Sequence, residues 1–246
     1  MRLMKTLTAA TTSLLLLTGA AIAEDKGMIK IVTQSPLSGQ QSVAGEGIML
    51  GAQLAVAQFG KQLTDMGFQL SIQPEDDQAT PNVGVANANR ILNDRAVLGV
   101  VGHYNSGVAI PSSEVYAKDN LVMVSPANTN PAITDRETTR AIANRICGRD
   151  DIQGPAGANF AMDTLKAKKV YIINDKSAYG SGIAQTFEAA ARKNGANVIL
   201  STGMDQNETD FSSILNRARV DQPDLIYYGG TYPQGGLPWW RRPGQR

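Results

Sequence analysis

Two polar loops in the chain have residue types that suit the two ends of a free amino acid. One is the segment 102–107, Gly-His-Tyr-Asn-Ser-Gly, and the other is the segment 125–131, Ser-Pro-Ala-Asn-Thr-Asn-Pro. The first leads into a predicted helix, whose N-terminus presents unpaired N–H groups and a partial positive charge that suit a carboxylate, and Ser106 adds a hydroxyl donor. The second offers backbone carbonyls and the Thr129 hydroxyl, which suit an ammonium group. Together the two loops predict a site for a zwitterionic amino acid.

A purely structural role explains the same residues. Ser106 would then be a helix N-cap, worth about 1 kcal/mol and satisfied within its own helix. Asn128, Thr129 and Asn130 would be ordinary loop residues, whose side chains bond to nearby backbone. The residue pattern by itself leaves both interpretations open.

The composition argues against most catalytic and metal sites. The chain has one histidine, His103, and one cysteine, Cys147, so neither a histidine-based metal site nor an internal disulfide is expected. It contains no Gly-x-Ser-x-Gly elbow and no phosphate-binding Walker loop. Cys147 has no second histidine to act as its base, so a buried, unreactive thiol is expected. We therefore expect no catalytic residues, no metal and no cofactor.

Two further segments imitate known sites only weakly. The glycine-rich segment 45–51 begins a dozen residues after the preceding predicted strand and has one residue too many for a dinucleotide-binding turn, so NAD binding is not expected. The acidic run 75–77 has ligands for a divalent cation, but a solvated acidic loop is the favoured interpretation.

The overall composition is that of an ordinary globular protein of one or two domains. Of the 246 residues, 42% are hydrophobic and 18% are charged. The formal charge of +1 lacks the excess of basic residues that is typical of proteins that bind nucleic acid, so no nucleic-acid partner is expected.

The first 23 residues have the features of a signal peptide. Arg2 and Lys5 precede a short apolar run, and residues 21–23, Ala-Ile-Ala, provide the small residues of a cleavage site after Ala23. The apolar run is shorter than the roughly 20 residues of a membrane span. Cleavage would leave 21 basic and 22 acidic residues. An exported protein with one cysteine favours a bacterial periplasm.

The remaining chain alternates predicted strands and helices twice. The first series has strands at 28–33, 68–72, 97–101 and 121–124, with helices at 45–59, 82–94 and 106–119; the run 97–101 is typical of a strand buried on both faces. The second has helices at 151–165, 179–194 and 211–218, with strands at 169–174, 198–201 and 225–228. Gly195 is expected to end the helix before it. This pattern predicts an α/β protein of two lobes with parallel sheets flanked by helices, divided near residues 145–151. Ligands of such sheets bind beyond the carboxyl ends of the strands, where both polar loops lie.

Several blocks of the chain, in order, resemble the periplasmic leucine/isoleucine/valine-binding protein family. The most specific are Val-Val-Gly-His at 100–103, Ser-Pro-Ala at 125–127, Asp-Lys at 175–176 with Tyr-Gly at 179–180, Asp-Phe-Ser at 210–212, and Tyr-Tyr-Gly-Gly at 227–230. The resemblance covers residues 24–237. It implies a type I periplasmic binding fold, with an N-terminal lobe at 24–147 and an incomplete second lobe at 148–237.

The resemblance also implies ligand-binding roles for five residues. Ser106 matches the family serine that holds the ligand carboxylate, and Tyr104 lines the same pocket. Ala127, through its carbonyl, and Thr129 match positions that help to bind the carboxylate and the ammonium. Tyr179 matches a tyrosine of the second lobe that covers the ligand on closure.

The chain departs from the family pattern at several positions. Aromatic residues that wall the side-chain pocket are replaced by Ala44 and Thr231, and the positions of the family disulfide hold Ala79 and Asn105. These changes leave the side-chain specificity of the site open.

The last residues, 238–246, do not continue the family pattern. The segment Pro-Trp-Trp-Arg-Arg-Pro-Gly-Gln-Arg holds both tryptophans of the chain, where the family would continue with an amphipathic helix and a further acidic ligand residue. We hypothesise a frameshift near codon 237, with a natural divergent terminus as the alternative. Under the frameshift hypothesis this chain is expected to be unstable or to bind poorly, because sheet edges would stay exposed.

The resemblance implies a receptor that works by lobe closure without chemistry. The expected protein is a monomeric periplasmic solute-binding receptor of an ABC importer for a branched-chain or related aliphatic amino acid, with the membrane permease as its partner. The alternatives are a ligand-sensing regulatory protein of the same fold, of the amide-sensor type, and a non-functional frameshifted fragment.

Overall fold

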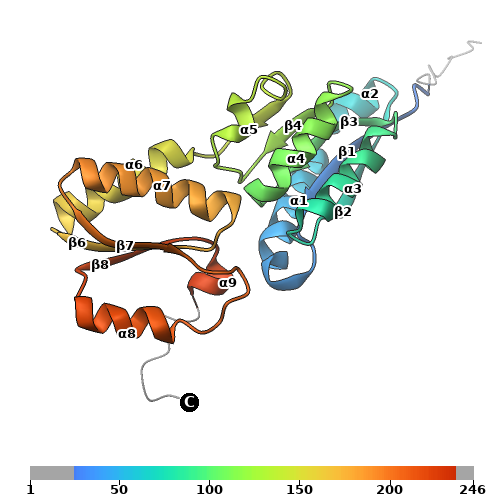
Figure 1. Ribbon diagram of the computed structural model, residues 1–246. Helices are drawn as coiled ribbons and strands as arrows, with labels where there is room; N and C mark the ends of the chain where they lie inside the picture. Colours follow the sequence, from blue (N-terminus) through green and yellow to red (C-terminus); the bar gives the residue numbers. More distant parts are fainter. Residues whose placement is uncertain (1–24, 237–246) are drawn as a thin grey trace, which may run out of the picture.

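The computed structural model describes residues 25–236 and contains two parallel β-sheets with helices packed against them (Figure 1). The first sheet has five strands in the order β2-β1-β3-β4-β5, and the second has three in the order β7-β6-β8. All of their strand pairs are parallel. The prediction of parallel sheets flanked by helices is confirmed. The expected signal peptide at 1–23 and the tail at 238–246 lie outside the described residues.

The first lobe contains the five-stranded sheet. Its strands are β1 (Met28–Ser35), β2 (Gln69–Asp76), β3 (Val97–Gly102), β4 (Val122–Ser125) and β5 (Ala143–Arg145). Its helices are η1 (Gly39–Gln41), α1 (Ser42–Phe59), α2 (Lys61–Asp65), α3 (Pro81–Leu92), α4 (Ser106–Ala117) and α5 (Ala132–Asp135). Helices α3 and α4 pack side by side on one face of the sheet, and α1 packs over β1 and β2.

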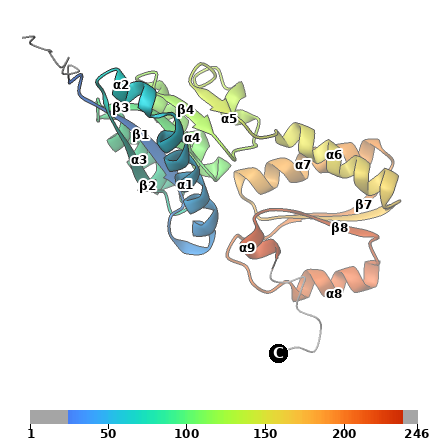
Figure 2. The ribbon, with the colours of Figure 1, turned by 180° about the vertical axis from the view of Figure 1, so that it is seen from behind.

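The second lobe contains the three-stranded sheet. Its strands are β6 (Lys169–Asn174), β7 (Asn197–Gly203) and β8 (Leu225–Gly229). Its helices are α6 (Asp150–Asn159), the π-helix η2 (Phe160–Thr164), α7 (Ala178–Lys193), α8 (Ser212–Asp221) and α9 (Tyr232–Gly235). Helices α6 and α7 lie on one side of this sheet and α8 on the other, and the segment 146–149 connects β5 to α6 (Figure 2).

Each lobe has its own apolar core. In the first, Val100 of β3 and Met123 of β4 pack against Ile91 of α3 and Tyr116 of α4, all at most 2% exposed. In the second, the rings of Phe187 and Tyr227 stack at a centroid distance of 3.7 Å. Burial of this apolar surface, at about 25 cal/mol per Å², holds each sheet to its helices.

Most predicted elements lie within a few residues of their observed positions, and Gly195 has a φ of +87° just after α7 as expected. The expectation that the strand at 97–101 is buried on both faces is wrong. A register shift between β1 and β3 leaves Leu98 out of the pairing, and its side chain is 55% exposed. The predicted helix at 151–165 changes to π-helical geometry at Phe160. The short strand β5 was not predicted, because its three residues carry no apolar alternation.

Within residues 25–236, no helix combines the length and the apolar character that crossing a membrane requires.

Candidate functional site

A cleft of about 650 Å³ lies between the carboxyl ends of the strands of the two sheets. The first lobe lines it with residues that follow β2, β3 and β4, and the second lobe with residues that follow β6, β7 and β8. All five residues predicted from the sequence line this one cleft: Tyr104, Ser106, Ala127, Thr129 and Tyr179. Segments far apart in the chain therefore meet where open parallel sheets place their ligands.

Ser106 is the first residue of α4 and is not the N-cap that the structural interpretation assumed. The N-cap position belongs to Asn105, whose side chain makes no capping hydrogen bond. The first N–H groups of this 12-residue helix therefore lack a side-chain cap. Within the described residues the Ser106 hydroxyl has no hydrogen-bond partner either, although the residue is only 2% exposed. The N-terminus of α4 therefore brings uncapped N–H groups and a free hydroxyl donor to the lining of the cleft.

Asn128 joins the two polar loops and does not behave as an ordinary loop residue. It is fully buried, and its side-chain oxygen accepts a hydrogen bond from the backbone N–H of His103 at 2.9 Å. Its side-chain nitrogen donates to the carbonyl of Tyr104 at 3.0 Å. The Ser125 hydroxyl also donates to the Asn128 side-chain oxygen, at 2.6 Å. These bonds fix the position of the Tyr104 to Ser106 segment relative to Ala127 and Thr129.

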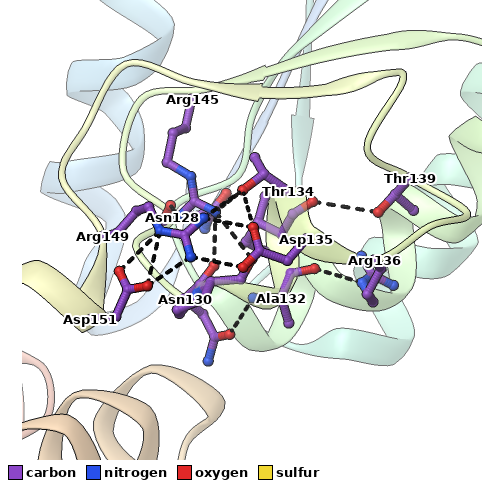
Figure 3. Close-up of polar contacts among 12 residues, drawn as sticks. Asn128, Asn130, Ala132, Thr134, Asp135, Arg136, Thr139, Arg145, Arg149 and Asp151 are labelled. Carbon is purple, nitrogen blue, oxygen red and sulfur yellow. Dashed lines mark hydrogen bonds and ion pairs between the residues drawn. The ribbon is translucent and has the colours of Figure 1, made fainter.

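Arg145, at the end of β5, binds the loop after β4 (Figure 3). Its guanidinium donates to the carbonyl of Asn128 and to the carbonyl of Asn130, both at 3.0 Å. It also donates to the hydroxyl of Thr134 at 2.7 Å. Partial burial lowers the pKa of Arg145. The arginine satisfies two backbone carbonyls of the loop, which favours a single loop conformation.

Asp150, the first residue of α6, has a buried carboxylate and lies in contact with Thr129. Its backbone N–H donates to the carbonyl of Thr129 at 2.9 Å. Its side chain is fully buried, and within the described residues neither of its carboxylate oxygens has a hydrogen-bond partner; the Thr129 hydroxyl also lacks one. Burial raises the pKa of Asp150, and the nearby Thr129 hydroxyl and Arg145 offset part of this effect. The carboxylate places negative potential next to the Thr129 hydroxyl.

Two tyrosines, one from each lobe, line the cleft. Burial raises the pKa of Tyr104, as does the nearby Tyr232. Burial also raises the pKa of Tyr179, and Asp150 adds to the effect. Both side chains therefore stay neutral near neutral pH and offer an aromatic surface with a hydroxyl.

The N-terminus of α7 forms the facing wall. Ser177 caps it by accepting a hydrogen bond from the N–H of Gly180 at 2.8 Å. The carboxylate of Asp175 accepts from the Ser177 N–H at 2.9 Å and from the Thr231 N–H at 3.3 Å. A Cβ at Gly180 would lie 2.1 Å from that carboxylate, so only glycine fits there. Asp175 thus fixes this wall.

The departures from the family pattern lie at different places. Ala79, Asn105 and Thr231 line the cleft, whereas Ala44 is not among its lining residues. The side-chain nitrogen of Asn105 donates to the side-chain oxygen of Gln41 at 2.7 Å. This hydrogen bond holds η1 against the loop before α4.

The weaker candidate segments have structural explanations. Asp77 is fully buried beside His103, so the expectation of a solvated acidic loop at 75–77 is wrong for this residue. Within residues 25–236, no cluster of three or more acidic, histidine or cysteine side chains could hold a metal. Gly45 is required by packing, since a Cβ there would lie 1.8 Å from the carbonyl oxygen of Pro36.

Cys147 is only partly buried, which corrects the expectation of a buried thiol. Its Sγ donates to the carbonyl of Asn128 at 3.4 Å, and burial raises its pKa. A raised thiol pKa favours the unreactive protonated form.

Asn128, Arg145, Asp150 and Asp175 are residues of the site that sequence reasoning missed. Asp150 has one local signal, because an acidic residue in a first helical turn is typical of a helix start. That signal accounts for an acidic residue at this position but does not predict that its side chain is buried. Its position behind Thr129 depends on how β5 leads into α6.

Comparison with known proteins decides the family. Residues 28–242 match the model of a family described as periplasmic binding protein. The chain belongs to the periplasmic binding protein family.

Named relatives of this periplasmic binding protein agree with that assignment. It is 36% identical over 234 residues to the Leu/Ile/Val-binding protein BraC3 of Rhizobium johnstonii, an alignment that covers 95% of this chain and 62% of the relative. The solved leucine binding protein LivK from Thermotoga maritima is 27% identical, with a TM-score of 0.77 over 85% of this chain and 58% of that one. A substrate-binding protein from Desulfitobacterium hafniense, solved in complex with Leu, is 26% identical, with a TM-score of 0.67 over 86% and 61% of the two chains. The chain therefore spans about three-fifths of these relatives.

Proposed function

We propose that this protein is the substrate-binding receptor of an ABC importer, and that it binds a branched-chain or related aliphatic amino acid between its two lobes. One observation carries the proposal: the Ser106 hydroxyl, at the N-terminus of α4, has no hydrogen-bond partner among residues 25–236, and Ser106 lines the same cleft as Thr129 and Tyr179. A ligand carboxylate would accept hydrogen bonds from Ser106 and from the first N–H groups of α4, where the helix end is positive.

The ammonium group of the ligand would bind on the side of Thr129. The carbonyl of Ala127 and the hydroxyl of Thr129 are acceptors there, and the buried Asp150 carboxylate supplies the negative potential. The ring of Tyr179 would cover the ligand from the second lobe. The names of relatives support this ligand type, and one of them was solved in complex with Leu.

We extend the proposal to the place and the partner of the receptor in the cell, for which family membership is the support. The receptor would act as a monomer in the periplasm after cleavage behind Ala23, and its closed form would dock on the membrane permease. It performs no chemistry, needs no cofactor or metal, and binds no nucleic acid. Binding shifts the equilibrium between open and closed lobes, since ligand touches both walls only when they close.

The test is calorimetric titration of the protein with leucine, isoleucine and valine, repeated with the variant Ser106→Ala. We expect saturable binding and an affinity about tenfold lower in the variant, because a charge-assisted hydrogen bond is lost. Ser112→Ala is the matched control: Ser112 lies in the same helix, and its buried hydroxyl has no partner within the described residues. Equal affinity in Ser106→Ala and in the parent would contradict the proposed carboxylate site.

A further inference from the structure

Four polar side chains form a buried network behind the wall of the cleft. They are Gln34 of β1, Asp77 after β2, His103 after β3 and Tyr116 of α4, and each is fully buried. The proposed binding function assigns no role to them. Buried polar groups in native proteins are hydrogen-bonded, so each contact in this network needs one donor proton and one acceptor. The position of each proton can therefore be worked out from the contacts.

The orientation of Gln34 sets the direction of the first hydrogen bond. Its side-chain nitrogen donates to the carbonyl of Gly84 at 2.8 Å, which places its side-chain oxygen toward Tyr116. The Tyr116 hydroxyl donates to that oxygen at 2.5 Å. A tyrosine hydroxyl has one proton, so Tyr116 can only accept from any further neighbour.

That further neighbour is His103, whose two ring nitrogens each lie next to an oxygen atom of the network. Its Nε2 lies 3.3 Å from the Tyr116 hydroxyl, and its Nδ1 lies 3.2 Å from the Oδ2 of Asp77. The other carboxylate oxygen of Asp77 accepts from the N–H of Ala79 at 3.0 Å. Since Tyr116 and an ionised Asp77 are both acceptors here, the contacts require a proton at Nε2 and another between Nδ1 and Asp77.

We propose that His103 is a positioning residue for the ligand cleft, which acts by sharing an extra proton with Asp77. The two groups then form a buried pair with no net charge, an imidazolium beside a carboxylate. A buried pair of this kind is tolerated, whereas either charge alone would be strongly unfavourable.

The pair joins two segments that line the cleft. Asp77 immediately precedes the loop that contributes Ala79 and Pro81, and His103 precedes Tyr104 and Ser106. Without the shared proton, one ring nitrogen of His103 would be an acceptor. It would then face another acceptor, either the carboxylate of Asp77 or the hydroxyl oxygen of Tyr116. The segments would then separate, and the Ser106 hydroxyl would move from its place at the helix N-terminus.

Few titratable groups of the described residues contact this pair. Within the described residues, the titratable groups in contact with His103 are Asp77 and Tyr116. Burial raises the pKa of Tyr116, and the negative charges of Asp77 and Glu75 raise it further, so the tyrosine keeps its proton. Glu75 is itself paired with Arg90 of α3 at 2.5 Å.

Nitrogen-15 NMR of the protein labelled at histidine tests the proton count directly. His103 is the only histidine in the chain, so the imidazole signals need no assignment. We expect signals of two protonated ring nitrogens in the ligand-free protein at neutral pH. A spectrum with one protonated and one unprotonated nitrogen would overturn the proposal.

The variant Asp77→Asn separates this arrangement from a general effect of burial. An amide can donate to Nδ1 while its oxygen still accepts from the Ala79 N–H, so the fold is expected to persist with a neutral imidazole. We expect one unprotonated nitrogen in this variant and two protonated ones in the matched control Glu75→Gln. Two protonated nitrogens in Asp77→Asn would contradict the shared proton.

The consequence for affinity rests on the proposed amino-acid binding. At neutral pH, affinity for leucine should be severalfold lower in Asp77→Asn than in the parent, because a neutral hydrogen bond replaces the charge-assisted pair, and it should not change in the control Glu75→Gln. Equal affinity in Asp77→Asn and in the parent, with both nitrogens protonated in the parent, would refute the positioning role. Absence of any leucine binding would instead refute the proposed function and leave the NMR result standing.

Discussion

The hydroxyl of Tyr232, in α9 of the second lobe, donates to the backbone carbonyl of Gln40, in η1 of the first lobe, at 2.9 Å. The two residues are 192 positions apart in the chain. Tyr232 also lines the cleft. The bond therefore connects the lobes directly, in addition to their covalent connection at 146–149.

Loss of this bond should weaken ligand binding. In Tyr232→Phe the ring remains and only the hydroxyl is removed, so the two lobes lose one hydrogen bond between them, worth about 1 kcal/mol. We expect the affinity for leucine to fall about fivefold by calorimetry, with the circular dichroism spectrum unchanged.

The control for Tyr232→Phe is Tyr171→Phe. Tyr171 is a buried tyrosine of β6 whose hydroxyl donates to Asp221 of α8. Its removal should lower stability and leave affinity unchanged. An unchanged affinity in Tyr232→Phe would show that the bond to Gln40 does not contribute to ligand binding.

Tyr179 should contribute through its ring. Its side chain lines the cleft from α7, and burial keeps its hydroxyl neutral. We expect Tyr179→Ala to bind leucine at least about tenfold more weakly, because the ligand loses an apolar cover, and Tyr179→Phe to stay within about threefold of the parent. Equal losses in both variants would assign the effect to the hydroxyl instead.

Asp150 should lower stability at neutral pH while it supports binding. A carboxyl with a raised pKa is most favourable in the folded state when protonated, so its ionisation reduces stability as the pH rises above its ordinary value of 3.8 through the raised pKa. We expect Asp150→Asn to melt at a higher temperature than the parent at neutral pH, with a difference that shrinks in acid. Its leucine affinity should fall, because the negative potential behind Thr129 is lost.

The neighbouring variant Asp151→Asn separates that effect from a general loss of negative charge. Asp151 is exposed and pairs with Arg149 at 2.7 Å. Its replacement should lower the melting temperature. A lower melting temperature in Asp150→Asn at neutral pH would contradict the assignment of an unpaired buried carboxylate.

Arg149 should stabilise the connection between the lobes. Its guanidinium bonds to both carboxylate oxygens of Asp135 in α5, at 2.6 and 2.7 Å, and also to Asp151 in α6 (Figure 3). We expect Arg149→Ala to lower the free energy of unfolding in urea by about 1 kcal/mol, and less at high salt. Arg149 lowers the pKa of Asp135 and of Asp151, so this contribution is present above their ordinary pKa and is lost as the pH falls.

Arg140→Ala is the control for Arg149→Ala. Arg140 forms a longer ion pair with Glu137, at 3.8 Å, between side chains that are 66% and 90% exposed. Its removal should change stability by less than about 0.5 kcal/mol. Equal effects of the two arginine variants would show that Arg149 has no special role.

Local patterns in the sequence predicted the elements and the loops that carry the cleft. The alternation of apolar runs identified β1, β6 and α7 to within about two residues, because strand and helix periods are local properties. The rule that ligands bind beyond the carboxyl ends of parallel strands placed the segments around Ser106 and Thr129 at one edge. Neither prediction required knowledge of which distant residues are in contact.

Partners far apart in the chain were decided by the tertiary structure. The contacts of Asn128 with His103 and Tyr104 depend on how the ends of β3 and β4 lie together. The burial of Asp150 depends on the packing of α6 against α7, and the bond of Tyr232 to Gln40 depends on the approach of two lobes. Hydrogen bonding and desolvation act through space at a few ångströms, so they follow the packing of the elements and leave no period in the sequence.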